Sequence, residues 1–495
     1  MTKTDKPNIL IFMTDQQRGD TIYPYNRAYT PNLDKFCKEG ITFSNAFCPS
    51  PHCCPSRATF FTGLYPSEHG VWNNVKVGNA LSRGPYEDVC LWSEDLKDAG
   101  YKLNYSGKWH VSATKTPVDY GWEMTNPEKL VQDLGDKESA QPFLAEKERW
   151  DKYKGLAEQT GPENRNEGEI LRPGFFTYTQ YGEKDTYYKD QKVVNNALEI
   201  IRSREEDGSP WCQYVGPLGP HDPYYVPKKY LDMFAPEDFE LPSNFEDRMN
   251  DKPGLYRRTR SRFDQLTDDE HRNSIRHYMA LCTYEDHLFG QILEELKERG
   301  ELDNTLVIYL SDHGDYAAEH GLWCKGLPCF KGAYHIPAVV RWPGGIKNSG
   351  RIVEAFVSLA DFAPTILETA GVKVDRKFTG QSLVPFFNGE EPENWRDAIF
   401  TQTNGNELYG IQRSIMTDKW KYVYNGFDFD ELYDLENDPD EVKNLASDPE
   451  YDYIVKSLMG RIWRFAYEHK DSCVNSYITV SLAPYGPVEA FRTKP

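Results

Sequence analysis

The most informative stretch of this chain of 495 residues runs Cys53-Cys54-Pro55-Ser56-Arg57-Ala58-Thr59-Phe60-Phe61-Thr62-Gly63. It follows the pattern C-x-P-S-R-x-x-x-x-T-G, and only Cys53 stands two residues before Pro55 and four before Arg57. A purely structural interpretation makes it a buried cysteine pair at a helix start, with Ser56 as the cap and Arg57 paired with a surface carboxylate. So many fixed positions make that the weaker interpretation.

Apolar strands and helices alternate around this stretch. Residues 8–13 form a continuous apolar run typical of a buried parallel strand, and Pro31 opens a helix with Thr30 at its N-cap. Residues 41–43 and residues 103–106 are expected as further strands.

The same alternation continues toward the C-terminus. Residues 211–215 form an aromatic and apolar strand, and residues 278–296 carry apolar side chains at helical spacing up to Gly300. Residues 305–310 form a β-branched, apolar strand. The pattern predicts an α/β fold with a large, mostly parallel sheet sandwiched by helices. Such sheets build their sites from polar residues that follow the strands.

The texture of the sequence changes past about residue 385. Short strands and one helix are expected at residues 397–400, 409–411, 414–416, 421–424 and 455–467. We therefore predict a catalytic α/β domain over residues 1–385 and a C-terminal subdomain over residues 386–495, a smaller antiparallel sheet plus a helix. Residues 125–190, charged and rich in Gly and Pro, are predicted to be a variable surface insertion.

Composition narrows the classes of partner and compartment. The formal net charge of −20 argues against nucleic acid and anionic membranes, so an anionic substrate would need a local group of cations. No run is long enough to cross a bilayer, and the apolar run at residues 9–13 is too short for a secretory leader. The ten cysteines lack regular disulfide or zinc spacing, so most are expected to be reduced and buried. A cytoplasmic protein is expected, or a periplasmic or secreted one if a leader has been removed.

The pattern that begins at Cys53 is the one that formylglycine-generating enzymes recognise. On it the chain resembles the type I, formylglycine-dependent sulfatases of the alkaline phosphatase superfamily. Other family motifs follow in family order from Asn8 to about Asn444, among them Tyr433-Asp434-Leu435 of the C-terminal subdomain. The resemblance implies that a maturation enzyme converts Cys53 to formylglycine. A hydrated aldehyde offers one hydroxyl as nucleophile and a second to expel the product, whereas a thiol supplies only the first step.

The resemblance also implies a metal site. Asp15, after the first strand, and Asp312 with His313, after a later one, match the family's metal ligands together with the modified Cys53. Oxygen ligands suit a hard cation, so Ca2+ is expected, with Mn2+ or Mg2+ as alternatives. Many sulfatases have two successive aspartates where this chain has Asp15-Gln16, and Asn in place of His313, so the chain resembles the choline-sulfatase and phosphonate-monoester-hydrolase branch. Gln16 either lends its carbonyl oxygen to the metal or stays outside the ligand set.

Three basic side chains are implied on the nucleophile side of the reaction. By resemblance, Arg57 fixes the aldehyde hydrate, while Lys108 and His110 orient it and reopen the sulfated intermediate, with His110 as the base. Lys108 and His110 stand two residues apart after a strand, so they point the same way if the segment stays extended.

Three further residues are implied around the sulfate group. His221 matches the family loop that contacts sulfate or protonates the leaving oxygen, and Lys325 matches the lysine that binds sulfate and the bridging oxygen. Asn74 stands where the choline-sulfatase branch has a sulfate-contacting amide, and a turn residue explains it equally well. Lys325 and His221, with Arg57, Lys108 and His110, would supply the local group of cations that the net charge of −20 calls for.

Together the motifs predict a sulfuric ester hydrolase acting on a sulfated small molecule or carbohydrate. Two alternatives are a phosphonate monoester or phosphodiester hydrolase that uses the same aldehyde, and a catalytically silent glycan-binding homologue in which Cys53 stays a thiol. A carbohydrate is favoured because the insertion carries aromatic rings that either stack on sugars or pack against the domain, at Trp150, Tyr153, Phe175, Phe176, Tyr178 and Tyr181.

Overall fold

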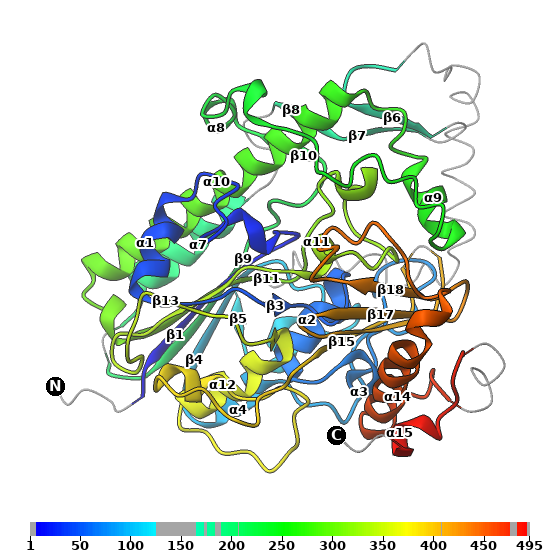
Figure 1. Cartoon of the computed structure of the whole chain (residues 1–495). Helices are drawn as coiled ribbons and strands as arrows, with labels where there is room; N and C mark the ends of the chain where they lie inside the picture. The colour runs from blue at the N-terminus through cyan, green and yellow to red at the C-terminus, as the bar shows by residue number, and fades with distance from the viewer. Residues whose placement is uncertain are drawn as a thin grey trace.

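A large mixed sheet forms the centre of the molecule (Figure 1). The computed structural model describes residues 6–124, 165–172, 176–183, 190–205, 207–406, 408–475 and 483–492. Within them the sheet has eight strands in the order β13-β2-β12-β11-β1-β9-β4-β5. In that order the strands span Arg351–Val353, Ile41–Phe43, Ala338–Arg341, Thr305–Ser311, Asn8–Thr14, Trp211–Gly216, Lys102–Gly107 and Glu123–Met124.

Most neighbouring strands of this sheet are parallel. β1 pairs in parallel with β11 and β9, and β4 pairs in parallel with β9 and β5. β12 runs antiparallel to β11 and β2, and β13 is again parallel to β2. The predicted fold class, a mostly parallel sheet between helices, is confirmed.

The central strand β1 is covered on both faces. Ile9, Ile11 and Met13 pack into one hydrophobic cluster, Leu10 and Phe12 pack into another, and all five are fully buried. Successive side chains of a strand point to opposite faces, so a strand that is buried on both faces has a continuous apolar run. This burial accounts for the uninterrupted apolar sequence at its start.

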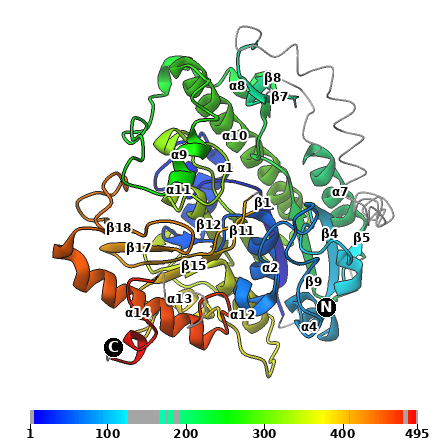
Figure 2. The same cartoon turned by 90° about the vertical axis from the view of Figure 1, so that its right-hand side faces the viewer.

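Helices form a layer on each face of the sheet (Figures 1 and 2). One layer holds α1 (Pro31–Glu39), α7 (Asp190–Ser203) and the long α10 (Asp268–Glu298). The other holds α2 (Cys53–Thr62), α4 (Trp92–Asp98) and α12 (Phe362–Thr369). Shorter elements are α3 (Pro66–His69), α8 (Lys228–Leu231), α9 (Gly254–Arg260), α11 (Lys331–Tyr334), α13 (Val384–Phe387), α15 (Glu489–Arg492), β3 (Ala46–Phe47), β6 (Glu169–Arg172), β7 (Phe176–Thr179), β8 (Tyr181–Glu183), β10 (Tyr224–Val226) and β14 (Val357–Ser358).

The start of α1 depends on a distant residue. Thr30 is at the N-cap position, as predicted, but its side chain makes no capping hydrogen bond. Instead the carboxylate of Asp286, on α10, accepts hydrogen bonds from the backbone N–H groups of Asn32 at 3.2 Å and Leu33 at 2.7 Å. A tertiary contact therefore satisfies the free donors of this helix start.

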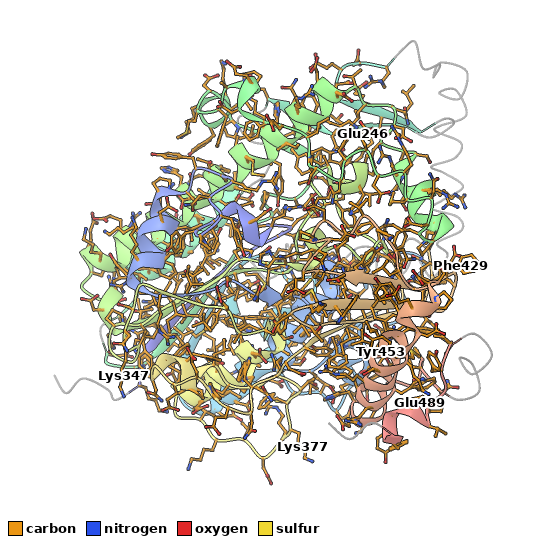
Figure 3. The ribbon with its side chains drawn as sticks, viewed as in Figure 1. Glu246, Lys347, Lys377, Phe429, Tyr453 and Glu489 are labelled. Atoms are coloured by element: carbon orange, nitrogen blue, oxygen red, sulfur yellow. The ribbon has the colours of Figure 1, made fainter. Side chains whose placement is uncertain are left out.

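A separate four-stranded antiparallel sheet lies toward the C-terminus. It consists of β15 (Ile399–Thr403), β16 (Gln412–Met416), β17 (Trp420–Asn425) and β18 (Glu431–Asp434), with α14 (Asp452–Glu468) packed against it. Phe429 and Tyr453 project from this part into solvent, at 80% and 72% exposure (Figure 3).

The predicted architecture of this region, a small antiparallel sheet plus a helix, is confirmed, but one strand was misassigned. Residues 409–411 form a loop before β16, in which the Gly410 N–H donates to the Asn404 carbonyl at 3.0 Å. A loop hydrogen bond has replaced the expected strand pairing there. The domain boundary at residue 385 stays a prediction.

The cysteines of this chain are all free, and seven of the ten are buried. Within the described residues, no helix has both the length and the apolar character that crossing a bilayer requires. The cellular compartment stays a prediction.

Candidate active site

Two neighbouring strands deliver the acidic residues of the site. β1 and β11 pair in parallel with Thr14 opposite Ser311, so the next residues, Asp15 and Asp312, leave the sheet side by side. Both aspartates are fully buried. The backbone N–H of Gln16 donates to Asp312 Oδ1 at 3.1 Å and joins the two loops. The acidic residues therefore stand at the carboxyl edge of the parallel strands, where such sheets place their sites.

The cysteine stretch enters the site as the first turn of a buried helix. α2 begins at Cys53, with His52 at the N-cap position, and all ten of its residues are buried. A helix N-terminus carries partial positive charge and free N–H groups, which favour an anion there. Ser56 does not cap this helix, although the weaker, purely structural interpretation expected it to: it lies inside the first turn, and its Oγ donates to the backbone carbonyl of Asp312.

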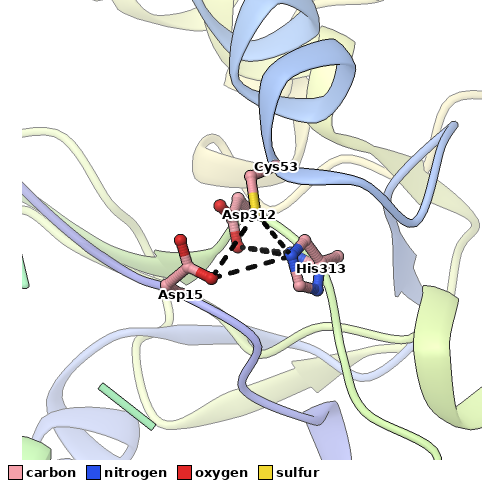
Figure 4. A group of neighbouring side chains, drawn as sticks. All are labelled: Asp15, Cys53, Asp312 and His313. Carbon is pink, nitrogen blue, oxygen red and sulfur yellow. Dashed lines mark hydrogen bonds and ion pairs between the residues drawn. The ribbon is translucent and has the colours of Figure 1, made fainter. Parts of the chain in front are cut away.

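Four buried side chains converge at this point (Figure 4). They are Asp15, Cys53, Asp312 and His313, whose potential ligand atoms all lie within 4.8 Å of one another. Cys53 Sγ is 3.3 Å from His313 Nε2 and 3.8 Å from Asp15 Oδ1. His313 Nε2 is 3.7 Å from a carboxylate oxygen of each aspartate. The structure thus brings together all four residues that were predicted as metal ligands.

The imidazole of His313 is oriented for ligation. Its Nδ1 is 2.9 Å from the backbone carbonyl of Gly314, and because a carbonyl only accepts, Nδ1 carries the proton. Nε2 therefore presents its lone pair to the cluster. Two carboxylates and one imidazole, with position 53 as a fourth ligand, form a donor set that fits a divalent cation.

Arg57 forms hydrogen bonds with both carboxylates of the site. It lies one turn after Cys53 and is fully buried; its Nε donates to Asp312 Oδ2 at 2.7 Å and its Nη2 to Asp15 Oδ2 at 3.2 Å. Its Nη1 donates to the Tyr214 hydroxyl at 2.9 Å. Pairing with a surface carboxylate, the purely structural interpretation, is therefore wrong: the guanidinium faces the metal-ligand candidates.

Lys108 and His110 reach the cluster from the end of β4. Lys108 Nζ donates to Asp15 Oδ2, and both side chains interact with Cys53. His110 has a left-handed φ of 54°, so the segment is not extended as assumed. Burial and Lys108 lower the pKa of His110, which leaves its imidazole neutral at neutral pH. Its buried Nδ1 has no hydrogen-bond partner in the described part of the chain.

Neighbouring cations control ionisation in the cluster. Burial raises the pKa of the Cys53 thiol, but the nearby cations, Lys108 first, outweigh burial and bring the pKa well below its ordinary value. Burial likewise opposes ionisation of Asp15, and the surrounding cations again leave its pKa below the usual range. Burial and the charge of Asp15 raise the pKa of Asp312. The two buried carboxylates repel each other when both are ionised, and a divalent cation between them would reduce that repulsion.

Lys325 and His221 form the opposite wall of the site. Lys325 Nζ is 2.6 Å from His221 Nε2, and His221 Nδ1 is 2.6 Å from the Asp222 carbonyl. Burial lowers the pKa of Lys325, but Cys53 and nearby carboxylates, Asp222 among them, raise it above its ordinary value. Burial and Lys325 lower the pKa of His221, and the carboxylates outweigh them, so it too is raised. The raised pKa of each group favours its protonated form, so this wall offers a proton donor and a hydrogen-bond donor side by side.

Gln16 is turned away from the metal-ligand candidates. Its side-chain carbonyl accepts a hydrogen bond from Lys325, and its Nε2 donates to Asp222 Oδ1 at 3.0 Å and to Asp315 Oδ2 at 2.6 Å. Gln16 therefore lies outside the set of metal-ligand candidates and does not offer its carbonyl oxygen to a metal. Its amide instead connects Lys325 to the carboxylates of Asp222 and Asp315.

Sequence reasoning missed the roles of Asp222 and Asp315. Asp222 accepts hydrogen bonds from Gln16 and from the hydroxyl of Tyr178. Asp315 is fully buried, accepts from the Tyr224 hydroxyl at 2.5 Å, and burial raises its pKa to about 6. Their positions in the loops that also carry predicted site residues were the available signal.

The aromatic rings of the insertion divide into two groups where the structure describes them. Tyr178, on β7, reaches the site through Asp222. Tyr181 packs, with its ring 4.7 Å from that of His277. Trp150, Tyr153 and Phe175 lie outside the described residues, as does the side chain of Phe176.

Asn74 lies beside the first turn of α2. Its Oδ1 accepts from the backbone N–H of Cys54 at 3.1 Å, and its own N–H donates to Asn406 Oδ1 at 3.0 Å. The side chain therefore has a structural hydrogen bond next to Cys53. A contact between its amide and sulfate stays a prediction.

The fold and the site define a class: an enzyme of α/β architecture in which a buried cysteine lies among carboxylates that could hold a metal ion. The Sulfatase family profile matches residues 7–372, and the profile described as "N-sulphoglucosamine sulphohydrolase, C-terminal" matches residues 318–468. The chain belongs to the sulfatase family and is a sulfuric ester hydrolase, which confirms the resemblance inferred from Cys53.

Named relatives span most of this chain. A choline-sulfatase of Rhizobium meliloti is 30% identical over 90% of this chain and 83% of its own length. An N-acetylglucosamine-6-O-sulfatase of Bacteroides thetaiotaomicron is 25% identical over 95% of this chain and 88% of its own length. The solved phosphonate monoester hydrolase of Agrobacterium radiobacter superposes with a TM-score of 0.74 at 26% identity, covering 94% of this chain and 96% of that one.

Proposed function

We propose that this sulfatase removes sulfate from a carbohydrate sulfate ester, with formylglycine at position 53 and a Ca2+ ion beside it. The observation that carries the proposal is the convergence of Cys53 with Asp15, Asp312 and His313 at a buried point. The carbohydrate class is supported by the N-acetylglucosamine-6-O-sulfatase relative and by the match to the sulphoglucosamine sulphohydrolase C-terminal family. A sulfated small molecule is the competing substrate class, since another relative is named choline-sulfatase.

Position 53 has the surroundings that a hydrated aldehyde needs. When formed and hydrated, formylglycine supplies two hydroxyl groups, one to attack sulfur and one to expel the product. The N-terminus of α2 and the charges of Lys108 and Lys325 favour negative charge at this position. The proposal requires a formylglycine-generating maturation enzyme as a partner.

Asp15, Asp312 and His313, with residue 53, would hold the divalent cation. A bound cation supplies positive charge that stabilises the negative charge developing on the sulfate group. The two carboxylates favour Ca2+, while the imidazole also suits Mn2+. Activity after chelation and separate addition of Ca2+, Mn2+ and Mg2+ identifies the ion.

The remaining site residues act on protons. As the bond between sulfur and the bridging oxygen breaks, His221 gives that oxygen one proton while Lys325 donates a hydrogen bond to it, and the alcohol leaves. His110, whose pKa is lowered by burial and by Lys108, then takes the proton of the remaining hydroxyl. The carbon–oxygen bond to sulfate breaks, sulfate departs and the aldehyde is restored.

The test is a desulfation screen with protein of verified modification. Conversion of Cys53 lowers the intact mass by about 18 Da, and Cys53→Ala is the inactive control. Sulfated mono- and oligosaccharides are compared with choline sulfate and nitrophenyl sulfate. Release of sulfate from a carbohydrate supports the proposal. Hydrolysis confined to choline sulfate or nitrophenyl sulfate contradicts it, and glycan binding with an unmodified thiol indicates the silent homologue.

One observation favours a second activity on phosphonate monoesters. The Asp15-Gln16 and Asp312-His313 pairs depart from the common sulfatase pattern, and a phosphonate monoester hydrolase is a structural neighbour. Values of kcat/KM for an aryl sulfate and the matching aryl phosphonate, measured with Ca2+ and with Mn2+, rank the two activities. A higher value on the phosphonate would make it the main reaction.

A further inference from the structure

A cavity of about 290 Å³ opens beside Lys325, on the side of the site formed by Lys325 and His221. Lys325 lines it together with Arg258 and Arg262, which come from α9 and the turn that follows it. Leu327 and Leu408 line it as well. One cavity therefore connects the residue that faces the leaving oxygen with two arginines that the reaction does not use.

The cavity is positively charged, whereas the protein as a whole is negatively charged. Its described lining residues include three cations and no carboxylate, in a chain of net charge −20. Arg258 and Arg262 are exposed, and in the described structure neither guanidinium has an acidic partner. Like charges that line one cavity repel each other. An anion from outside the chain would relieve this repulsion.

Arg257 and Arg260, the other two arginines of residues 257–262, do not line the cavity but bind backbone carbonyls. Arg257 Nη1 donates to backbone carbonyls at 3.0 and 3.1 Å, and the buried Arg260 donates to three more at 2.7 to 2.9 Å. These bonds fix α9 against the chain. Four arginines within six residues therefore divide into two that fix the segment and two that line the cavity.

We propose that this cavity is a subsite for a second anionic group of the substrate, a sulfate or a carboxylate on the same sugar or the adjoining one. The inference rests on the proposed action on carbohydrate sulfates. Arg258 and Arg262 offer planar, always charged donors that match both groups. Leu327 and Leu408 offer apolar surface to the ring carbons of a sugar. The enzyme therefore prefers substrates with two anionic groups over those with one.

The test is calorimetric binding to Cys53→Ala protein, which does not turn the sugars over. One matched pair is N-acetylglucosamine 6-sulfate and N-sulfoglucosamine 6-sulfate, in which the nitrogen carries a neutral acetyl group or an anionic sulfo group. The other is a sulfated uronic acid disaccharide and its methyl ester, which differ by a carboxylate. We expect the doubly anionic member of at least one pair to bind about tenfold more tightly, as two partly exposed ion pairs allow. The pair that responds identifies the anion.

Arginine variants show whether the preference comes from this cavity. Arg258→Gln/Arg262→Gln should reduce it to less than about twofold, and Arg258→Lys/Arg262→Lys should retain part of it. Lys228→Gln/Arg272→Gln, which removes two charges from α8 and α10, is the matched control and should leave the preference unchanged. Equal affinities within both pairs, or a preference that survives in the arginine-to-glutamine variant, would overturn the inference.

Kinetics of the active enzyme separate this inference from the proposed function. No desulfation of any carbohydrate contradicts the proposed function. Desulfation with the same KM for both members of each pair contradicts the subsite alone. In the supporting result, Arg258→Gln/Arg262→Gln raises KM about tenfold for the doubly anionic sugar, leaves kcat nearly unchanged and leaves nitrophenyl sulfate unaffected.

Discussion

Replacing His221 with alanine should slow hydrolysis by an amount that depends on the leaving group. A sugar hydroxyl keeps most of the developing negative charge on the bridging oxygen, whereas a nitrophenol spreads that charge over its own ring. His221 Nε2 and Lys325 Nζ are 2.6 Å apart on the wall that faces this oxygen. Their contacts are therefore worth most in the transition state of a poor leaving group.

The expected loss for a sugar sulfate is about 100-fold in kcat/KM. One charge-assisted contact of this kind contributes about 2.7–4 kcal/mol, or roughly 100- to 1000-fold. The lower end applies because the His221 side chain is 26% exposed and because Lys325 remains, held by Gln16. Nitrophenyl sulfate should lose less than about tenfold, since little charge collects on its bridging oxygen.

The assay is a series of aryl sulfates with phenols of different pKa, together with one sugar sulfate. The logarithm of kcat/KM is plotted against the pKa of the leaving group, and His221→Ala should steepen the slope. Arg57→Lys is the control: Arg57 contacts Asp15 and Asp312 rather than the leaving group, so the line should fall without changing slope. Thermal melts verify that both variants fold. Parallel lines for His221→Ala and the parent enzyme would refute the assignment and give His221 a role in sulfate binding.

Other predictions test the nucleophile, the metal, the base and the stability. Cys53→Ala should abolish turnover while Cys54→Ala retains substantial activity; equal loss in two folded variants would contradict the motif register. Chelation should remove activity and Asp312→Asn should weaken metal binding measured by calorimetry, whereas full activity of metal-free protein would rule out the site. His110→Ala should accumulate sulfated enzyme that intact mass detects, and a variant with no such species would assign the base elsewhere. Burial raises the pKa of Asp430 to about 7, above the value of about 3.9 in an unfolded chain, so its contribution to stability is present below pH 4 and lost as pH rises through 7. Asp430→Asn should raise the free energy of unfolding at pH 8 by about 1–2 kcal/mol, a value reduced for partial exposure, and leave it unchanged at pH 4; identical melting profiles from pH 4 to 8 would contradict this.

Local sequence was a reliable guide wherever one face or one motif decided the outcome. The run at residues 8–13 is apolar throughout because β1 is covered on both faces. The helix expected at residues 278–296 lies within α10, because its apolar stripe faces the sheet. The pattern at Cys53 was recognisable because all of its fixed residues lie within the short stretch of residues 53–63. Each of these properties depends on neighbours along the chain.

Contacts between residues that lie far apart in the chain could not be predicted from the sequence. Arg57 was paired with a surface carboxylate in the structural interpretation, and it contacts Asp312, 255 residues away. That contact exists because β1 and β11 are adjacent and parallel, an order that no single strand specifies. Gln16 is similar, since the direction of its amide depends on Lys325 and Asp315 arriving from another loop.

Most strands, the main helices, the cysteine motif and the identity of the candidate ligands could thus be predicted from the sequence. Only the three-dimensional structure shows that Asp15, Cys53, Asp312 and His313 meet at one point, and that Lys325 and His221 form a pair opposite them. The physical reason is that secondary structure follows from side-chain patterns within one segment. The distances within a site follow instead from the order and register of strands whose loops are hundreds of residues apart.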